Sequence, residues 1–270
     1  MKKSYRQAVG CPSFWIEWGT DYGKSSKQSL KKVPETDAIF ENVKTKDQPD
    51  HPGDIKRLSM DCKATVNLGA FSRGGKTRGD NQALDHDFGA EEKYIPCGIV
   101  DEDSGQLYLH FGSSYKTSDF MVDNLKAWWN SLPKEEQNLT QLIQLKIDNG
   151  PESSGVRTQF LKRMVDFADE IGKPFQLLYY PPYHSKYNPI ERCWGILEQH
   201  WNGTLLRDLQ TLLRWAQSMT WKGIHPIVYL NDTIYKKGIS LNKRDMQEIE
   251  CRLERNPVLP KWDILIQPAY

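Results

Sequence analysis

Three acidic residues stand at places where an α/β sheet exposes side chains that can do chemistry. Asp61 lies within the alternating run RLSMDCKATV, Asp148 ends the apolar run LIQLKID just before Asn-Gly, and Glu191 closes the run Asn-Pro-Ile-Glu. Ligand sites in open α/β folds form at the carboxyl ends of strands. Three carboxylates that converge there would make a pocket of hard oxygen ligands suited to Mg²⁺ or Mn²⁺.

Each of these acids also has an ordinary structural interpretation. Acids after strands commonly form turns, and a glutamate in the first turn of a helix is often only part of a cap. Asn188 is suited to the N-cap position and Pro189 to the first helical position, which places Glu191 in that first turn. The spacing alone therefore leaves the metal-site and the structural interpretations open.

The elements that must position these acids follow from the hydrophobic periodicity. Residues 57–71 alternate as a half-buried strand, and residues 93–112 read as a hairpin around Asp103-Ser104-Gly105. Helical patterns and two further apolar strands then alternate along the chain. The expected helices cover 117–133, 153–174, 187–201, 207–219 and 241–255, and the expected strands 142–148 and 175–180. This order predicts a mixed α/β sheet with an antiparallel edge and a parallel centre.

The composition excludes several classes of protein. The chain of 270 residues has 36 Lys and Arg against 35 Asp and Glu, a net charge of +1. That balance argues against a dedicated nucleic-acid coat protein but not against a nucleic-acid enzyme, whose metal site concentrates acids. The five cysteines form no CxxC pair, which favours reduced thiols over a disulfide framework or a zinc site. No apolar run approaches the ~20 residues of a membrane span, and the N-terminus lacks the apolar core of a signal peptide.

The chain divides into three parts by pattern. Residues 1–55 are expected to form an irregular arm or remnant with at most a short helix around ETDAIFENV. Residues 56–220 carry the strand and helix signals and all three acids, so they form the expected catalytic domain. Residues 221–270 are expected to add a helical extension.

Three blocks of the sequence resemble the catalytic blocks of DDE transposases. YYPPYHSKYNPIERCWG resembles the third block, LKIDNGPESS the second and MDCKATV the first. The chain resembles a mariner-type transposase of a bacterial insertion sequence, most closely the Rhodopirellula-type group. Four further stretches carry that resemblance, which covers residues 30 to 265: PETDAIFENV, FSRGGKTR, ALDHDFG and HWNGTLL.

The resemblance implies a fold, a set of catalytic residues and an activity. The fold is ribonuclease-H-like (retroviral-integrase-like), an α/β fold with a mixed sheet flanked by helices, and the catalytic acids and metal ligands are Asp61, Asp148 and Glu191. Two Mg²⁺ (or Mn²⁺) ions clamp a phosphodiester; one activates the attacking oxygen and the other stabilises the departing oxyanion. The expected function is metal-dependent DNA cleavage and strand transfer, with the transposon ends and target DNA as partners and a homodimer as the active complex. The expected location is the bacterial cytoplasm, in association with the nucleoid.

Two alternatives to this function stay open. One is a stand-alone nuclease of the same fold, which cuts DNA without joining it. The other is an inactive, transposase-derived protein that only binds DNA. DNA cleavage of any kind would distinguish the transposase and the nuclease from the inactive binding protein. Strand transfer would distinguish the transposase from the nuclease.

Basic residues at two places are candidates for DNA contacts. One group lies on a glycine-rich turn and the other beside Glu191, where cations and backbone N–H groups could hold phosphates. The alternatives are a solvated hairpin tip, a loop histidine without a role and an arginine paired with an acid. The candidates are Arg73, Lys76 and Arg78 on the turn, and His184, Lys186 and Arg192 beside the acid.

The N-terminal part lacks the expected DNA reader. Transposases of this type normally carry N-terminal helix-turn-helix modules, whereas residues 1–55 show no pair of capped amphipathic helices. The pattern indicates an N-terminal truncation and predicts poor discrimination of the element's ends, with binding that falls steeply with salt. Alternatively, the aromatic and Lys-rich arm folds on DNA and reads the ends itself.

Overall fold

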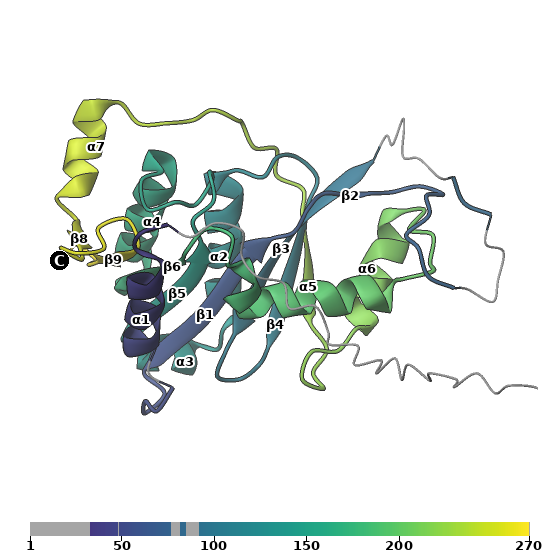
Figure 1. The fold of residues 1–270 in the computed structure, drawn as a ribbon, viewed down its shortest axis with the longest axis horizontal. Helices are drawn as coiled ribbons and strands as arrows, with labels where there is room; N and C mark the ends of the chain where they lie inside the picture. Colours follow the sequence, from purple (N-terminus) through teal and green to yellow (C-terminus); the bar gives the residue numbers. More distant parts are fainter. Residues whose placement is uncertain (1–32, 48, 77–81, 85–91, 270) are drawn as a thin grey trace, which may run out of the picture.

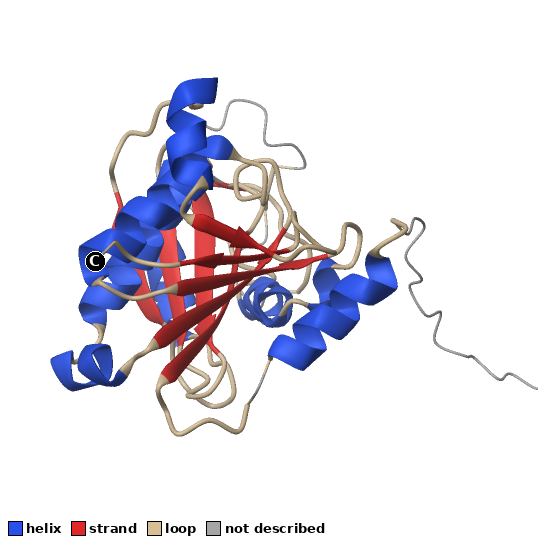
Figure 2. Cartoon of the chain, turned by 90° about the vertical axis from the view of Figure 1, so that its left-hand side faces the viewer, coloured by secondary structure: helices blue, strands red, loops and turns tan. Residues whose placement is uncertain are grey.

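The computed structural model describes residues 33–47, 49–76, 82–84 and 92–269. In this part of the chain a single nine-stranded mixed sheet forms the core, with helices on both of its faces (Figures 1 and 2). The strands are β1 (Ile55–Cys62), β2 (Val66–Asn67), β3 (Lys93–Asp101), β4 (Leu107–Gly112), β5 (Leu142–Asp148), β6 (Phe175–Tyr180), β7 (Ile227–Asn231), β8 (Leu253–Arg255) and β9 (Asp263–Ile266).

The centre of the sheet has the topology that the sequence predicts. The strand order is β7-β4-β3-β1-β5-β6-β9-β8, with β2 paired to β3. β4, β3 and β1 are antiparallel neighbours, and β1, β5 and β6 run parallel. Three antiparallel strands followed by two parallel strands, in the order β4-β3-β1-β5-β6, are the ribonuclease-H-like arrangement. The expected mixed α/β fold is thereby confirmed.

The helices cover the two faces with separate apolar clusters. On one face, α2 (Ser118–Ser131) and α4 (Thr158–Ile171) pack together over the central strands. On the other, α5 (Pro189–His200) and α6 (Leu209–Ser218) contribute Trp194 and Leu212 to a second cluster that includes Leu109 and Phe111 of β4. The remaining helices are α1 (Thr36–Lys46), α3 (Lys134–Leu139), α7 (Lys243–Glu250) and the short 3-10 helix η1 (Ser185–Tyr187). None of the helices in the described residues has both the length and the apolar character needed to cross a bilayer.

The segment after residue 220 differs from the expected helical extension. β7 pairs in parallel with β4, and β9 pairs antiparallel with β6, so both edges of the central sheet are extended. The helix expected over 241–255 ends at Glu250, and Leu253–Arg255 form β8 instead. The physical reason is that the edges of β4 and β6 present unpaired backbone groups, which these strands satisfy while Ile264 and Ile266 become fully buried.

Part of the expected N-terminal arm is also folded onto the sheet. α1 buries Ile39 and Val43 against β6. Asp47, directly after α1, accepts a 2.8 Å bond from Arg57 Nε and lies 2.7 Å from Lys146 Nζ. Lys146 is only 1% exposed. This helix therefore belongs to the same folded unit as the central strands of the sheet.

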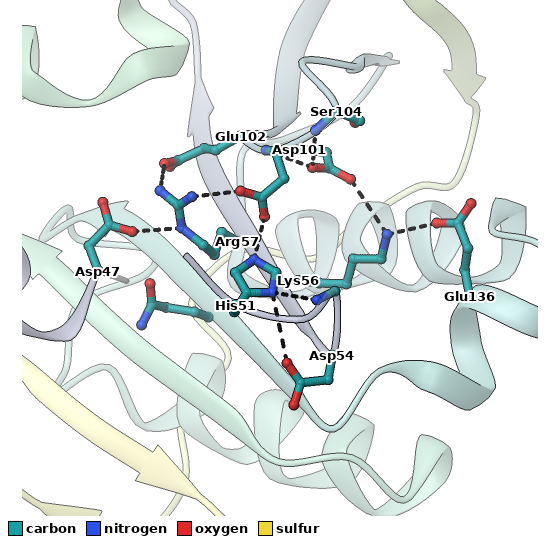
Figure 3. A network of polar contacts seen from close by, with 12 residues as sticks. Asp47, His51, Asp54, Lys56, Arg57, Asp101, Glu102, Ser104 and Glu136 are labelled. Carbon is teal, nitrogen blue, oxygen red and sulfur yellow. Dashed lines mark hydrogen bonds and ion pairs between the residues drawn. The ribbon is translucent and has the colours of Figure 1, made fainter. Parts of the chain in front are cut away.

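Charged side chains form a network at the amino end of β1 (Figure 3). Arg57 lies between Asp47 on one side and Asp103, 2.6 Å from its Nη1, on the other. Lys146 Nζ lies 2.6 Å from Glu102 Oε2, which also contacts Arg57 at 3.4 Å. Burial raises the pKa of Asp47, but the hydrogen bonds from Arg57 and Lys146 outweigh it and hold that pKa below its usual range. The cations and acids of this cluster thus offset one another's desolvation.

Candidate active site

The parallel pairing of β1 and β5 brings Asp61 and Asp148 side by side. The register pairs Ser59 with Lys146 and Met60 with Ile147, so the next step along both strands pairs the two aspartates. Side chains that are directly opposite on neighbouring strands lie on the same face of a sheet. Asp61 is the last but one residue of β1 and Asp148 the last of β5, both at carboxyl ends. The structure therefore places two of the three expected acids together.

Glu191 reaches this place from the start of α5. The helix begins at Pro189, with Asn188 at the N-cap position, and the backbone N–H of Glu191 donates to the Asn188 carbonyl at 3.0 Å. The expected position of Glu191 in the first helical turn is confirmed. Its charge contributes to the raised pKa of Asp148.

Asn188 links the helix to both aspartate strands rather than capping the helix. Its side chain is fully buried, and Nδ2 donates to the Met60 carbonyl at 3.3 Å and to Asp148 Oδ1 at 3.2 Å. The side chain makes no capping hydrogen bond with α5. The sequence pattern predicts only a cap at this residue, because a contact across 40 residues to Asp148 has no local signal.

Asp61 is held by a second residue of α5. Trp194 Nε1 donates to Asp61 Oδ2 at 3.2 Å. Helix and strand can approach closely because Gly98, which pairs with Asp61 across β3, has no side chain. A Cβ at Gly98 would lie 2.6 Å from Ile190 Cδ1 and 2.7 Å from Trp194. Trp194 is thus a buried member of the apolar cluster beneath α5 that also orients Asp61.

Asp61 and Asp148 have too little positive charge nearby to offset their burial and their mutual repulsion. Burial raises the pKa of Asp61. The pKa of Asp148 rises to about 6, because the carboxylate is desolvated and repelled by Asp61 and Glu191, which the hydrogen bond from Asn188 only partly offsets. Among the described basic groups, Lys116 acts on both aspartates, and none forms a salt bridge with either. A divalent cation would relieve this repulsion.

The carboxylate oxygens of Asp61, Asp148 and Glu191 suit hard divalent cations, each of which would be held by two carboxylates. In the described part of the chain, no three His, Cys, Asp or Glu side chains are grouped around one ion position. A two-ion site does not need such a group, because each ion can take its protein ligands from a pair of carboxylates and the rest from water and phosphate. Asp61 and Asp148 offer one such pair, and Glu191 adds oxygens from α5.

Of the three basic residues beside Glu191 that are candidates for DNA contacts, one is buried and two are exposed. His184 is 5% exposed, bonds the Pro182 carbonyl through Nδ1 at 2.8 Å, and packs edge-on against Phe40 of α1. This burial favours a structural role. Lys186 and Arg192 are exposed, and Lys186 Nζ lies 5.1 Å from the Tyr187 ring centroid.

The glycine-rich turn lies at the other end of α5 from Glu191. Arg73 donates to the Asn67 carbonyl at 3.1 Å and its guanidinium lies 5.5 Å from the Trp201 ring, just beyond the end of the helix. At 1.5 Å per residue, the helix separates this turn from Glu191 by roughly 15 Å. Lys76 is exposed there, and Arg78 lies outside the described residues. The structure therefore does not bring Arg73 and Lys76 to the acids.

The sequence matches a known protein family over most of its length. The sequence model of the family described as the Rhodopirellula transposase DDE domain matches residues 22–268. No curated protein matches the chain by sequence.

Similar solved structures include several complexes of Mos1 transposase. The paired-end complex with the left transposon end has a TM-score of 0.49 and 10% identity, over 73% of this chain and 58% of that chain. The pre-cleavage transpososome has a TM-score of 0.47 and 10% identity, over 73% and 58%. The strand transfer complex has a TM-score of 0.47 and 10% identity, over 73% and 57%. The chain thus spans less than three fifths of the length of these chains.

Proposed function

This chain belongs to the family of the Rhodopirellula transposase DDE domain, and from that premise we propose that it catalyses metal-dependent DNA cleavage and strand transfer. The observation that carries the proposal is the side-by-side placement of Asp61 and Asp148 at the ends of adjacent parallel strands. Their pKa values are raised by burial and, at Asp148, by the neighbouring acids. Partly buried acids with raised pKa values at such a position are typical of functional sites.

We assign the metal ligands to Asp61, Asp148 and Glu191, and the metal to two Mg²⁺ or Mn²⁺ ions. When bound, such ions activate the attacking oxygen and stabilise the charge on the departing one. The chain's own contribution is to fix the ligands. Asn188 holds one oxygen of Asp148, and Trp194 holds one oxygen of Asp61. Both residues belong to the segment that carries Glu191, so the same packing positions all three acids.

DNA is the substrate in this proposal, and the two ends of an element are joined in a homodimer. Because each end requires cleavage and transfer, two copies of the site acting together are the natural assembly. The test uses a plasmid that carries the paired ends, identified from the DNA that flanks the gene. With Mg²⁺, joined products support the transposase, and cleavage without joining supports the stand-alone nuclease. If the protein does not cleave the plasmid with any divalent metal, the remaining alternative is an inactive, transposase-derived protein that only binds DNA.

A divalent metal is expected to stabilise the fold. An ion that binds only the native acids at ten times its dissociation constant contributes about 1.4 kcal/mol by mass action. For a domain of this size that corresponds to a rise in Tm of about 3–6 °C. The measurement is a thermal melt in Mn²⁺ and in EDTA, with the double variant D61N/D148N as the control that should not respond. An equal shift in both proteins would argue against binding at these acids.

A further inference from the structure

A cleft lies at the carboxyl ends of the central strands, the end of the sheet that also carries Asp61 and Asp148. Its volume is about 330 Å³, and it is bounded by the starts of α2 and α4 and by residues 236–239 in the connection from β7 to α7. That connection crosses above the sheet in Figure 1. A second cavity of about 280 Å³ shares Lys116, Glu152 and Lys237 with the first and adds Lys93 and Tyr115. We call the two cavities together the basic cleft, after five cations in its lining: Lys93, Lys116, Arg157, Lys236 and Lys237.

The basic cleft carries an excess of positive charge. Its two acids are already engaged, since Asp119 accepts hydrogen bonds from Arg163 and Gln159, and Glu152 lies 4.0 Å from Lys116. Among the described residues, four of the five cations have no acidic partner within salt-bridge distance: Lys93, Arg157, Lys236 and Lys237. The cleft therefore favours an anionic ligand.

Arg157 places a fixed guanidinium at the wall of the basic cleft. Its Nη2 donates to the Ile239 carbonyl at 2.9 Å, which fixes the guanidinium at the cleft wall. Its Nε is buried, and within the described chain it has no hydrogen-bond partner. The guanidinium is therefore a fixed cation without an acidic partner among the described residues, and a phosphate oxygen is a natural acceptor for a guanidinium.

The basic cleft is electrostatically connected to the catalytic acids. Burial lowers the pKa of Lys116, but Cys62, Asp61 and Glu152 raise it above its ordinary value. The same lysine acts on Asp148. Lys116 and Glu152 line both cavities, and Glu152 follows Asp148 by four residues in the chain, so the cleft begins directly after the strand that carries Asp148.

An aromatic side chain in the lining suits nucleic acid better than a free anion. Tyr115 is 45% exposed, and Lys237 Nζ lies 4.1 Å from its ring centroid. An exposed ring beside unpaired cations is the combination with which proteins stack bases and hold the backbone of a nucleic-acid strand.

We propose that the basic cleft binds the phosphodiester backbone of the DNA strand that leads to Asp61 and Asp148. The proposal rests on the proposed function, and it names the surface that delivers the substrate. Lys236 and Lys237 are the best residues to test because both are exposed, so alanine substitutions there should leave the fold intact.

The experiment measures the binding of a fluorescent random-sequence duplex in metal-free buffer over a series of salt concentrations. Each phosphate contact contributes about 0.9 to the slope of log affinity against log salt. K236A/K237A is therefore expected to lower that slope by about 1.8 and to weaken binding to every sequence alike. The matched control K44A/K134A also removes two exposed lysines, on α1 and α3, and should keep the wild-type slope.

The outcomes separate this proposal from the proposed function. The proposed role of the basic cleft would be overturned by a wild-type slope in K236A/K237A, or by an equal decrease in slope in K44A/K134A. Either result would do so whether or not the enzyme cleaves DNA. A reduced slope in K236A/K237A alone supports it, even if no cleavage is found. D148N removes a negative charge that repels phosphate, so it is expected not to weaken duplex binding in metal-free buffer, and loss of cleavage in D148N is attributable to the acids and not to the cleft.

Discussion

Asp148→Asn is expected to abolish DNA cleavage and, in the absence of metal, to make the protein more stable at neutral pH. The amide keeps an oxygen that can accept the bond from Asn188, now made at 3.2 Å, but it has no charge with which to hold a divalent cation. Since metal ions contribute several kcal/mol to such reactions, we expect the cleavage rate to fall by at least about 10³-fold.

The gain in stability follows from the direction of the pKa shift. The folded-state pKa of Asp148 is raised from 3.8 to about 6, so ionisation opposes folding at pH values above about 6. This penalty fades as the pH falls from about 6 toward 4, where the carboxyl is protonated in both states. Removing the charge should stabilise the metal-free protein on the order of 2 kcal/mol at pH 7.5, a figure reduced for the partial exposure of the group.

The two effects are measured on the same preparation. Plasmid nicking in Mg²⁺ gives the activity, and urea denaturation in EDTA at pH 7.5 and at pH 4.5 gives the free energy of unfolding. The difference between the wild type and D148N should be large at pH 7.5 and small at pH 4.5. Asp232→Asn, an exposed aspartate at the end of β7, is the matched control and should change neither quantity. Nicking by a folded D148N would refute the assignment of Asp148.

Lys146→Met is expected to destabilise the protein by about 3–5 kcal/mol, because it removes the cation from a buried ionic cluster. Lys146 Nζ lies 2.6 Å from Glu102 and 2.7 Å from Asp47. In the variant these two acids would be left with Arg57 as their shared cation. The methionine fills a similar volume, so the loss reports charge and hydrogen bonding rather than a cavity. Asp47 also ties α1 to the sheet, and α1 should loosen first.

Urea denaturation measures this loss, and hydrogen exchange of the α1 amides localises it. Lys162→Met is the control, since Lys162 pairs with Asp166 on the surface of α4 at a spacing of four residues, an interaction of about 0.5 kcal/mol. A change in the free energy of unfolding below about 1 kcal/mol for Lys146→Met would show that the cluster is not a net source of stability.

Much of the fold follows from local patterns in the sequence, and the choice of the three acids follows from the resemblance of three sequence blocks to those of DDE transposases. The alternation around Asp61 and the apolar run before Asp148 predict strands, because side chains on a pleated strand alternate between two environments. Asn188 and Pro189 predict the start of a helix, because they suit the N-cap and first helical positions. The structure confirms these elements as β1, β5 and α5. The chemical roles of the three acids stay predictions that the variants test.

Only the tertiary structure decided which distant residues meet. The register of β1 against β5 sets Asp61 beside Asp148. The side chain of Asn188 donates hydrogen bonds to Met60 and Asp148 instead of capping α5. The basic cleft gathers Lys93, Lys116, Arg157 and Lys237 from four separate segments. The strands after residue 220 were missed for the same reason. Periodicity reports only how each segment is buried, whereas strand pairing and charge clusters depend on backbone and side-chain contacts between segments that have no signature in the sequence of either one.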